Sequence, residues 1–328
     1  MNIGEIAKLA GVSRATVSRY LNDGYVSEEK RERIQQVIRE TGYTPSAQAQ
    51  MLRRGKTNLI GVIVPKISSE AVSRMVDGIT ITLEREGYHV LLGNTDLNIQ
   101  KEMEYLDIFQ THQVDGILFV GTQFPQKHLQ RMKKVQVPIV VLGQRLSGYS
   151  CVYHDDLSAA RDLTTHLIEA GCRTIAYLGV DTKDKAAGGM RRRGYLEALE
   201  QEGLPMQQEL MLEGPFAFEA GYEHMQRLYT ARPDIDGVFC ATDNIAAGAM
   251  CWLKQQGVEI PAQVKVCGVG DSRLARLMTP SLTSCHYHYK TGGIESAKIL
   301  LDSIREQTPV VREVKLSCVL QARESTIK

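Results

Sequence analysis

The chain has 328 residues, of which 43% are hydrophobic and 23% charged, and its formal net charge is +1. This length predicts two or three domains, and the composition is that of a soluble globular protein. No apolar run approaches the roughly twenty residues of a membrane span, and the start lacks a secretory-signal pattern, so we expect a cytoplasmic protein.

Charge is unevenly distributed along the chain. Residues 1–57 hold ten Lys and Arg against six Asp and Glu, a net charge of +4, so the remaining residues carry −3. A basic segment joined to a mildly acidic one indicates that the basic segment meets a polyanion, although a solvated helix face is the alternative. The seven cysteines are scattered without a Cys-x-x-Cys pair, which favours buried free thiols over disulfides.

Three short helices are predicted at the start of the chain. Residues 3–9 have apolar side chains at helical spacing, Gly11 and its neighbours form a tight turn, and Ser13 is suited to cap a second helix over residues 14–21. A third helix runs from residue 28 to about 40. This order is typical of a helix-turn-helix, whose second helix enters the DNA major groove; a three-helix bundle of another function is the alternative.

The second helix is too short to be stable alone and carries many hydrogen-bonding groups. Arg14 can donate two hydrogen bonds to a guanine, and Ala15 and the Thr16 methyl group can contact a thymine methyl group. Ser18 and Arg19 suit phosphates or bases. The candidate DNA contacts of this region are Ser13, Arg14, Ala15, Thr16, Ser18, Arg19 and Asn22.

From residue 59 onward, apolar runs of strand length alternate with amphipathic segments of helical length. The predicted strands are 59–64, 89–93, 116–121, 138–143, 174–180, 237–241, 265–270 and 314–320. Continuous apolar strands separated by helices indicate parallel sheets covered on both faces. Since so many strands exceed one typical open sheet, we expect two α/β subdomains with a ligand pocket between them.

The sequence "IGEIAKLAGVSRATVSRYLN…VSEEKRERI…TGYTPSAQAQMLRRGKTNLIGVIVP" closely resembles the start of the lactose-repressor/galactose-repressor (LacI/GalR) family of transcription regulators. The likeness runs through the whole chain to "LQARESTIK". It implies an N-terminal all-α helix-turn-helix domain with a hinge helix, followed by a periplasmic-binding-protein-like (type I) α/β domain of two doubly wound parallel-sheet subdomains.

The resemblance also implies domain boundaries. The helix-turn-helix domain would span 1–45, the hinge helix and linker 46–57, and the effector-binding and dimerisation domain 58–328. Within the last, the N-subdomain would comprise about 58–157 and 287–317, and the C-subdomain about 158–286 and 318–328. The chain ends without an added heptad-repeat helix, so a homodimer is expected rather than a tetramer formed by such a helix.

In that family the hinge helix orders on DNA and inserts a leucine into the minor groove, a position that Leu52 matches here. A small residue such as Ala49 would permit close approach to the duplex. The alternative for this segment is a flexible linker.

By match to family positions, the cleft between the subdomains would bind a small molecule. Arg191 could bind vicinal hydroxyls or an anion, and Phe216 could form an apolar wall for a sugar ring. For Asp243, capping the following helix is as good an explanation as ligand contact. The candidate effector contacts are Gln144, Asp155, Arg191, Phe216, Thr242, Asp243, Asn244 and Asp271.

The stretches "GVGDSRLARLMTP", "HDD" and "GGMRRRGY" most resemble trehalose-type repressors, with sucrose-type repressors also possible. We therefore expect a repressor of a carbohydrate-utilisation operon that binds a palindromic operator on double-stranded DNA and responds to a sugar or sugar-phosphate. A phosphocarrier protein or a purine as co-repressor is an alternative within the family. Outside it, a solute-binding sugar receptor and a sugar-acting α/β enzyme are the alternatives.

Other patterns do not support enzymatic chemistry. His286 and His288 of "CHYHY" share one side of a strand, which could begin a metal site, but a strand that crosses between the subdomains explains them better. "GVDTKDKAAGG" lacks the ending of a phosphate-binding loop, and no nucleophile elbow is present. We expect no enzyme activity, no metal and no cofactor beyond the effector.

Overall fold

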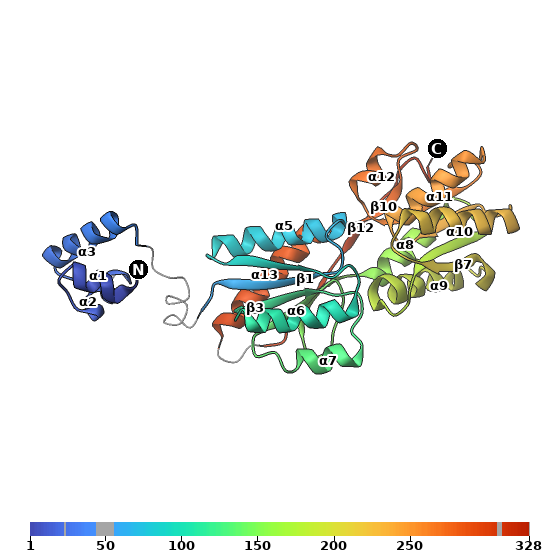
Figure 1. Ribbon diagram of the computed structural model, residues 1–328. Coiled ribbons are helices and arrows are strands. Elements are labelled where there is room, and N and C mark those ends of the chain that lie inside the picture. The colour runs from blue at the N-terminus through green and yellow to red at the C-terminus, as the bar shows by residue number, and fades with distance from the viewer. Residues whose placement is uncertain (23, 44–55, 307–309, 328) are drawn as a thin grey trace. The chain divides into compact units, whose positions relative to one another are not determined.

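The computed structural model describes residues 1–22, 24–43, 56–306 and 310–327. The chain divides into two compact units, Met1–Thr57 and Asn58–Lys328. Figure 1 shows the helices of the first unit and the two sheets of the second. The hinge segment and the two predicted DNA contacts in it, Ala49 and Leu52, lie outside the described residues.

The amino-terminal unit contains three helices close to the predicted ranges, α1 (Ile3–Leu9), α2 (Arg14–Tyr20) and α3 (Glu28–Thr41). They enclose a small core formed by Ile6, Ala7, Ala10, Val17, Val26 and Ile34. Asn2 caps α1 by accepting hydrogen bonds from two backbone N–H groups, and α3 ends at Gly42, which has a φ of +61°. The helix-turn-helix prediction is confirmed.

The carboxyl-terminal unit contains two six-stranded sheets of equivalent order. The N-subdomain sheet runs β11-β5-β4-β3-β1-β2, and the C-subdomain sheet runs β12-β10-β9-β8-β6-β7. The strands of the first are β1 (Leu59–Val64), β2 (His89–Asn94), β3 (Gly116–Val120), β4 (Ile139–Leu142), β5 (Ser150–His154) and β11 (Glu313–Leu316). Those of the second are β6 (Ile175–Val180), β7 (Met211–Gly214), β8 (Gly237–Cys240), β9 (Lys265–Gly270), β10 (Thr283–Tyr287) and β12 (Cys318–Gln321).

Helices cover both sheets. Those of the N-subdomain are α5 (Glu70–Arg85), α6 (Ile99–Thr111), α7 (Gln126–Met132) and α13 (Tyr289–Arg305). Those of the C-subdomain are α8 (Asp156–Glu169), a π-helical segment η1 (Lys185–Met190), α9 (Arg191–Gln201), a short η2 (Gln208–Leu210), α10 (Phe218–Ala231), α11 (Asp243–Gln255) and α12 (Arg273–Leu277). Within the described residues, no helix has both the length and the apolar character needed to cross a membrane.

Strand pairing is parallel except at one sheet edge, where β12 runs antiparallel to β10. The predicted strand 314–320 is in fact two strands: β11 pairs with β5 in one sheet and β12 with β10 in the other. Ser317 separates them, so the chain passes between the subdomains there. The chain also passes between them after β5 and after β10, which gives three crossings.

Two strands were not predicted because they lack a long apolar run. β5 reads SCVYH and β7 reads MLEG. By contrast, β1 and β3 are apolar and almost wholly buried, as expected for strands covered on both faces. The cysteines are all free and five of them are buried, which confirms the expectation of unpaired thiols.

Helices α5 and α13 approach so closely that glycine is required where they cross. A Cβ on Gly293 would lie 2.1 Å from the Met75 carbonyl oxygen, and one on Gly78 would lie 2.2 Å from that of Lys290. In the C-subdomain, Gly221 and Gly248 allow the same approach of α10 and α11. Because the obstructing atoms are backbone atoms, a side chain at any of these glycines would force the two helices apart.

Candidate functional site

The second helix of the amino-terminal unit presents a polar surface. The Ser13 hydroxyl caps α2 by accepting a hydrogen bond from the Thr16 N–H, and the Ser13 and Thr16 hydroxyls are 2.9 Å apart. Within α2, all of whose residues are described, only Val17 is buried. The helix therefore contributes little to the core, and most of its surface is available for contacts outside the unit.

The predicted DNA contacts of this region lie on or beside α2. Thr16 and Ser18 are half-buried, and the others are exposed: Ser13, Arg14, Ala15, Arg19 and Asn22. The Asn22 side chain donates a hydrogen bond to the Ser18 carbonyl group at 2.6 Å, so it caps the end of the helix. The Arg14 guanidinium lies over Gly4, where a Cβ would come within 2.7 Å of its Nε and Nη2.

A second candidate site is the cleft between the two subdomains. It has a volume of about 360 Å³, within the general size range of small-molecule sites. Its walls come from loops after β1, β3 and β4 on one side and from loops after β6, β8 and β9 on the other. These are the carboxyl ends of parallel strands, where ligands bind in open α/β sheets.

Arg191 lines the cleft and is held by partners from three elements. Its Nε donates a hydrogen bond to Asp156 at 2.7 Å, its Nη1 donates to the Ala241 carbonyl group, and its guanidinium lies 5.2 Å from the centre of the Tyr287 ring. The Tyr287 hydroxyl donates to the same Asp156 oxygen at 2.8 Å. This buried pair fixes the guanidinium in one orientation and neutralises its charge.

Thr242, Asp243 and Asn244 also line the cleft, at the start of α11. Thr242, not Asp243, is the N-cap, since its hydroxyl accepts a hydrogen bond from the Ile245 N–H. The Asp243 carboxylate instead accepts hydrogen bonds from the Ser284 hydroxyl and the Ser272 N–H. Burial raises the pKa of Asp243.

Asp184 and Phe216 complete this wall of the cleft. The Asp184 carboxylate accepts hydrogen bonds from the N–H groups of Ala186 and Ala187, at the start of η1. Burial raises its pKa to about 6. A π-helical turn directly before Arg191 is unusual, and such turns are frequent at functional sites.

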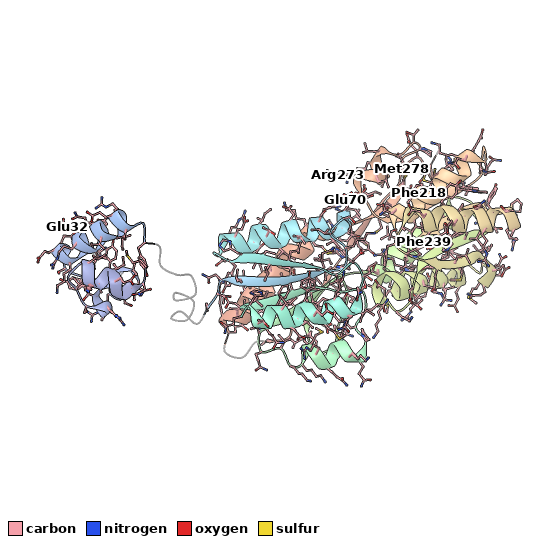
Figure 2. All side chains as sticks on the ribbon, in the orientation of Figure 1. Glu32, Glu70, Phe218, Phe239, Arg273 and Met278 are labelled. Atoms are coloured by element: carbon pink, nitrogen blue, oxygen red, sulfur yellow. The ribbon has the colours of Figure 1, made fainter. Side chains whose placement is uncertain are left out.

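A direct contact bridges the mouth of the cleft. Both carboxylate oxygens of Glu70, the first residue of α5, accept hydrogen bonds from the Arg273 N–H at 3.0 and 3.2 Å. Glu70 belongs to the N-subdomain and Arg273 to the C-subdomain, and Figure 2 shows the two residues beside each other. We call this contact the latch. It favours the closed arrangement of the two walls.

Three predicted effector residues do not line the cleft. Gln144 is buried and donates a hydrogen bond to the Gly121 carbonyl group at 2.8 Å, so it joins two strand ends. Asp155 caps α8 and pairs with Lys315 at 2.7 Å, and its neighbour Asp156 takes the cleft position.

The third of these residues, Asp271, is turned away from the cleft. Its carboxylate accepts hydrogen bonds from Arg276, Arg323 and His286. Burial alone would raise the pKa of Asp271, but these hydrogen bonds outweigh burial and hold the pKa below its usual value. Asp271 therefore fastens the carboxyl-terminal segment to β10.

The cleft residues that the sequence analysis missed lie after a strand, beside a crossing or, for Glu70, at the start of a helix. They are Glu70, His154, Asp156, Asp184, Tyr287 and Tyr289. Asp184 could have been identified as a cleft residue because it follows a strand. Glu70 could have been identified from the Ser-Ser-Glu sequence at the start of a helix. The choice between Asp155 and Asp156 depends on the direction of each side chain, which spacing does not give.

Two family models match the chain. Residues 2–46 match bacterial regulatory proteins of the lacI family, and residues 57–324 match the periplasmic binding proteins and sugar binding domain of the LacI family. A sucrose operon repressor from Staphylococcus xylosus is 32% identical over 306 residues, which cover 93% of this chain and 94% of that protein.

Solved structures agree with this match. The transcriptional regulator CelR in complex with cellobiose is 29% identical, with a TM-score of 0.77 over 99% of both chains. The lac repressor dimer bound to operator and the anti-inducer ONPF is similar in fold, with a TM-score of 0.89 at 22% identity over 100% of this chain and 99% of that one. These similar proteins are regulators. The two matched regions and the full-length likeness establish that this chain belongs to the lacI family of bacterial regulatory proteins.

Proposed function

We propose that the protein is a cytoplasmic, non-enzymatic repressor of a carbohydrate-utilisation operon. It binds a roughly palindromic operator as a homodimer, with α2 of each subunit in the major groove. A sugar or sugar-phosphate in the cleft controls the affinity for the operator. One observation carries the DNA-binding half of this proposal: α2 exposes a hydrogen-bonding face on a basic unit, and Val17 is the one residue of that fully described helix that is buried in the core, with Tyr20 packed partly against it.

The effector half is supported by the composition of the cleft. A buried guanidinium, four carboxylates and the aromatic side chains of Phe216 and Tyr289 face one volume, which suits a ring with several hydroxyl groups. The ligand would change the closure of the two walls and so the spacing of the paired DNA-binding units. A coupling free energy of about 1–3 kcal/mol would change operator affinity roughly five- to 150-fold.

The test is a DNA-binding titration with the full-length protein. The probes are the promoter fragment upstream of its own gene and random genomic fragments, each over a series of salt concentrations. We expect preference for the promoter fragment and a steep fall of affinity with salt. Sucrose, cellobiose, ribose and sugar phosphates are then added in turn, and one of them should shift promoter binding. Equal affinity for all fragments under every condition would exclude a sequence-specific regulator.

Arg14→Ala should relax operator specificity. A bidentate contact to a base contributes about 1–3 kcal/mol, so affinity for the operator should fall roughly five- to 150-fold per contact, with preference lost at one base pair of each half-site. The matched control is Arg39→Ala, which removes the same charge from an exposed position on α3. Binding-site selection on randomised half-sites measures the base preference of both variants. Unchanged base preference in Arg14→Ala would show that Arg14 does not read a base.

Glu70→Gln should weaken the latch and with it effector binding. Both oxygens of the Glu70 carboxylate accept a hydrogen bond from the Arg273 N–H, whereas the amide of glutamine has one oxygen, which is uncharged and accepts a weaker hydrogen bond. Partly exposed charge-assisted contacts contribute about 0.2–1 kcal/mol, so we expect up to about fivefold weaker binding by calorimetry. Glu84→Gln, an exposed position on the same helix, is the control. Equal affinities of the two variants would mean that the latch does not favour the liganded form.

A further inference from the structure

We propose that His154 Nε2 hydrogen-bonds a hydroxyl group of the carbohydrate effector, which makes His154 a specificity-determining residue of the cleft. This proposal rests on the proposed function and assigns one contact within it. The sequence did not identify His154 as a binding residue, either from its residue type or from its position at the end of the strand after which the chain passes to the C-subdomain.

The first argument is an unused hydrogen-bonding atom. Within the described parts of the chain, three buried side-chain atoms have no hydrogen-bond partner: Glu102 Oε2, His154 Nε2 and Tyr177 Oη. Among these three residues only His154 lines the cleft, and only 4% of its surface is exposed. A buried polar atom without a partner costs free energy, so a ligand that supplies the partner recovers that cost on binding.

The second argument is the fixed position of the imidazole ring. It stacks on Tyr287 with ring centres 4.6 Å apart and planes 19° apart, and it meets Tyr289 edge-to-face at 5.3 Å. Tyr287 is itself held by its hydrogen bond to Asp156. The ring therefore does not have to be ordered when a ligand arrives, which favours tight and selective binding.

The third argument is the charge state of the ring. Burial lowers the pKa of His154 to about 4, with the neighbouring Asp156 acting in the opposite direction. The imidazole is neutral at physiological pH, so Nε2 either donates or accepts one hydrogen bond, depending on the tautomer. A hydroxyl group does both. A neutral imidazole in this place thus suits a sugar hydroxyl better than a carboxylate or phosphate oxygen, which only accepts when fully ionised.

The fourth argument is the place of His154 in the fold. It is the last residue of β5, where the chain first crosses from one subdomain to the other, and Tyr287 is the last residue of β10, at the second crossing. A ligand whose hydroxyl group binds His154 would thus be held at the crossing, in the same cleft that Arg191 and Asn244 line. Binding there would bear directly on the angle between the two walls.

The test begins with calorimetry on the full-length protein. The probes are trehalose, sucrose, cellobiose, ribose and the 6-phosphates of trehalose and sucrose, and those that bind the parent protein are used with the variants. His154→Phe keeps a flat ring of similar size and removes both nitrogens. We expect affinity to fall about tenfold or more, with little change in the thermal midpoint. Tyr177→Phe is the matched control, since it removes a buried unpartnered atom outside the cleft, and its affinity should equal that of the parent.

A second measurement does not depend on a variant. The ¹⁵N resonance of His154 Nε2, assigned in the parent protein, should shift when the sugar saturates the cleft. Affinity of His154→Phe within twofold of the parent, or a resonance that the bound sugar leaves in place, would overturn the assignment of this contact while leaving the proposed function intact. Absence of binding by every sugar in the panel would overturn the effector half of the proposed function as well.

Discussion

Replacing Arg191 with methionine should lower the free energy of unfolding by about 3–5 kcal/mol and abolish the response to carbohydrate. Arg191 is buried, and its removal leaves Asp156 as an uncompensated charge in the protein interior. It also removes the only buried cation among the described residues that line the cleft. Chemical denaturation measures the first effect, and operator binding with and without sugar measures the second.

The double variant Arg191→Met with Asp156→Leu separates the two effects. Replacing both charges by apolar groups removes the unpaired carboxylate, so most of the lost stability should return. The response to sugar should remain absent, because neither partner is available for a ligand. If the double variant responded to sugar as the parent does, the pair would be structural and the ligand would bind elsewhere.

Replacing Gly293 with alanine should lower the midpoint of thermal unfolding by about 6–12 °C. The new Cβ would lie 2.1 Å from the Met75 carbonyl oxygen, so α5 and α13 would have to separate. Overpacking of this kind costs about 3 kcal/mol, and a unit of this size loses roughly 2–4 °C for each kcal/mol. Differential scanning calorimetry of the full-length protein measures the change.

Gly292, the neighbouring residue on the same helix, supplies the control. A Cβ there would meet the Leu142 and Leu316 side chains at 3.4 and 3.5 Å, which are ordinary contacts. Alanine also favours the helix by up to about 1 kcal/mol over glycine. Gly292→Ala should therefore keep or raise the midpoint. A similar loss in both variants would mean that helix contact at Gly293 is not the cause.

Much of the fold could be predicted because burial on both faces requires long apolar strands. The run LIGVIV gave the bounds of β1, and Ser13 was identified as the residue that caps α2. The prediction failed where a strand is short and carries polar residues, as in β5, or where two strands follow each other without a turn, as at Ser317. Around Ser317 the alternation of half-buried and exposed residues continues without a break although the chain passes from one sheet to the other.

The cleft was predicted less well than the fold, and the failures have a physical pattern. Arg191, Phe216, Thr242, Asp243 and Asn244 line it. Gln144, Asp155 and Asp271 were expected there but instead satisfy backbone or charged groups of the protein itself. The sequence places a polar residue after a strand, whereas the tertiary structure decides whether that residue faces the cleft or a neighbouring segment.

The crossings between the subdomains have a mechanical consequence. Each consists of one residue between regular elements: Asp155 between β5 and α8, His288 between β10 and α13, and Ser317 between β11 and β12. One short tether would let two bodies swivel freely, whereas three tethers restrain twisting and leave bending as the soft degree of freedom. A bound molecule would then bend the two subdomains about a defined axis. Because the connections are so short, little of its binding free energy would be spent on ordering loops.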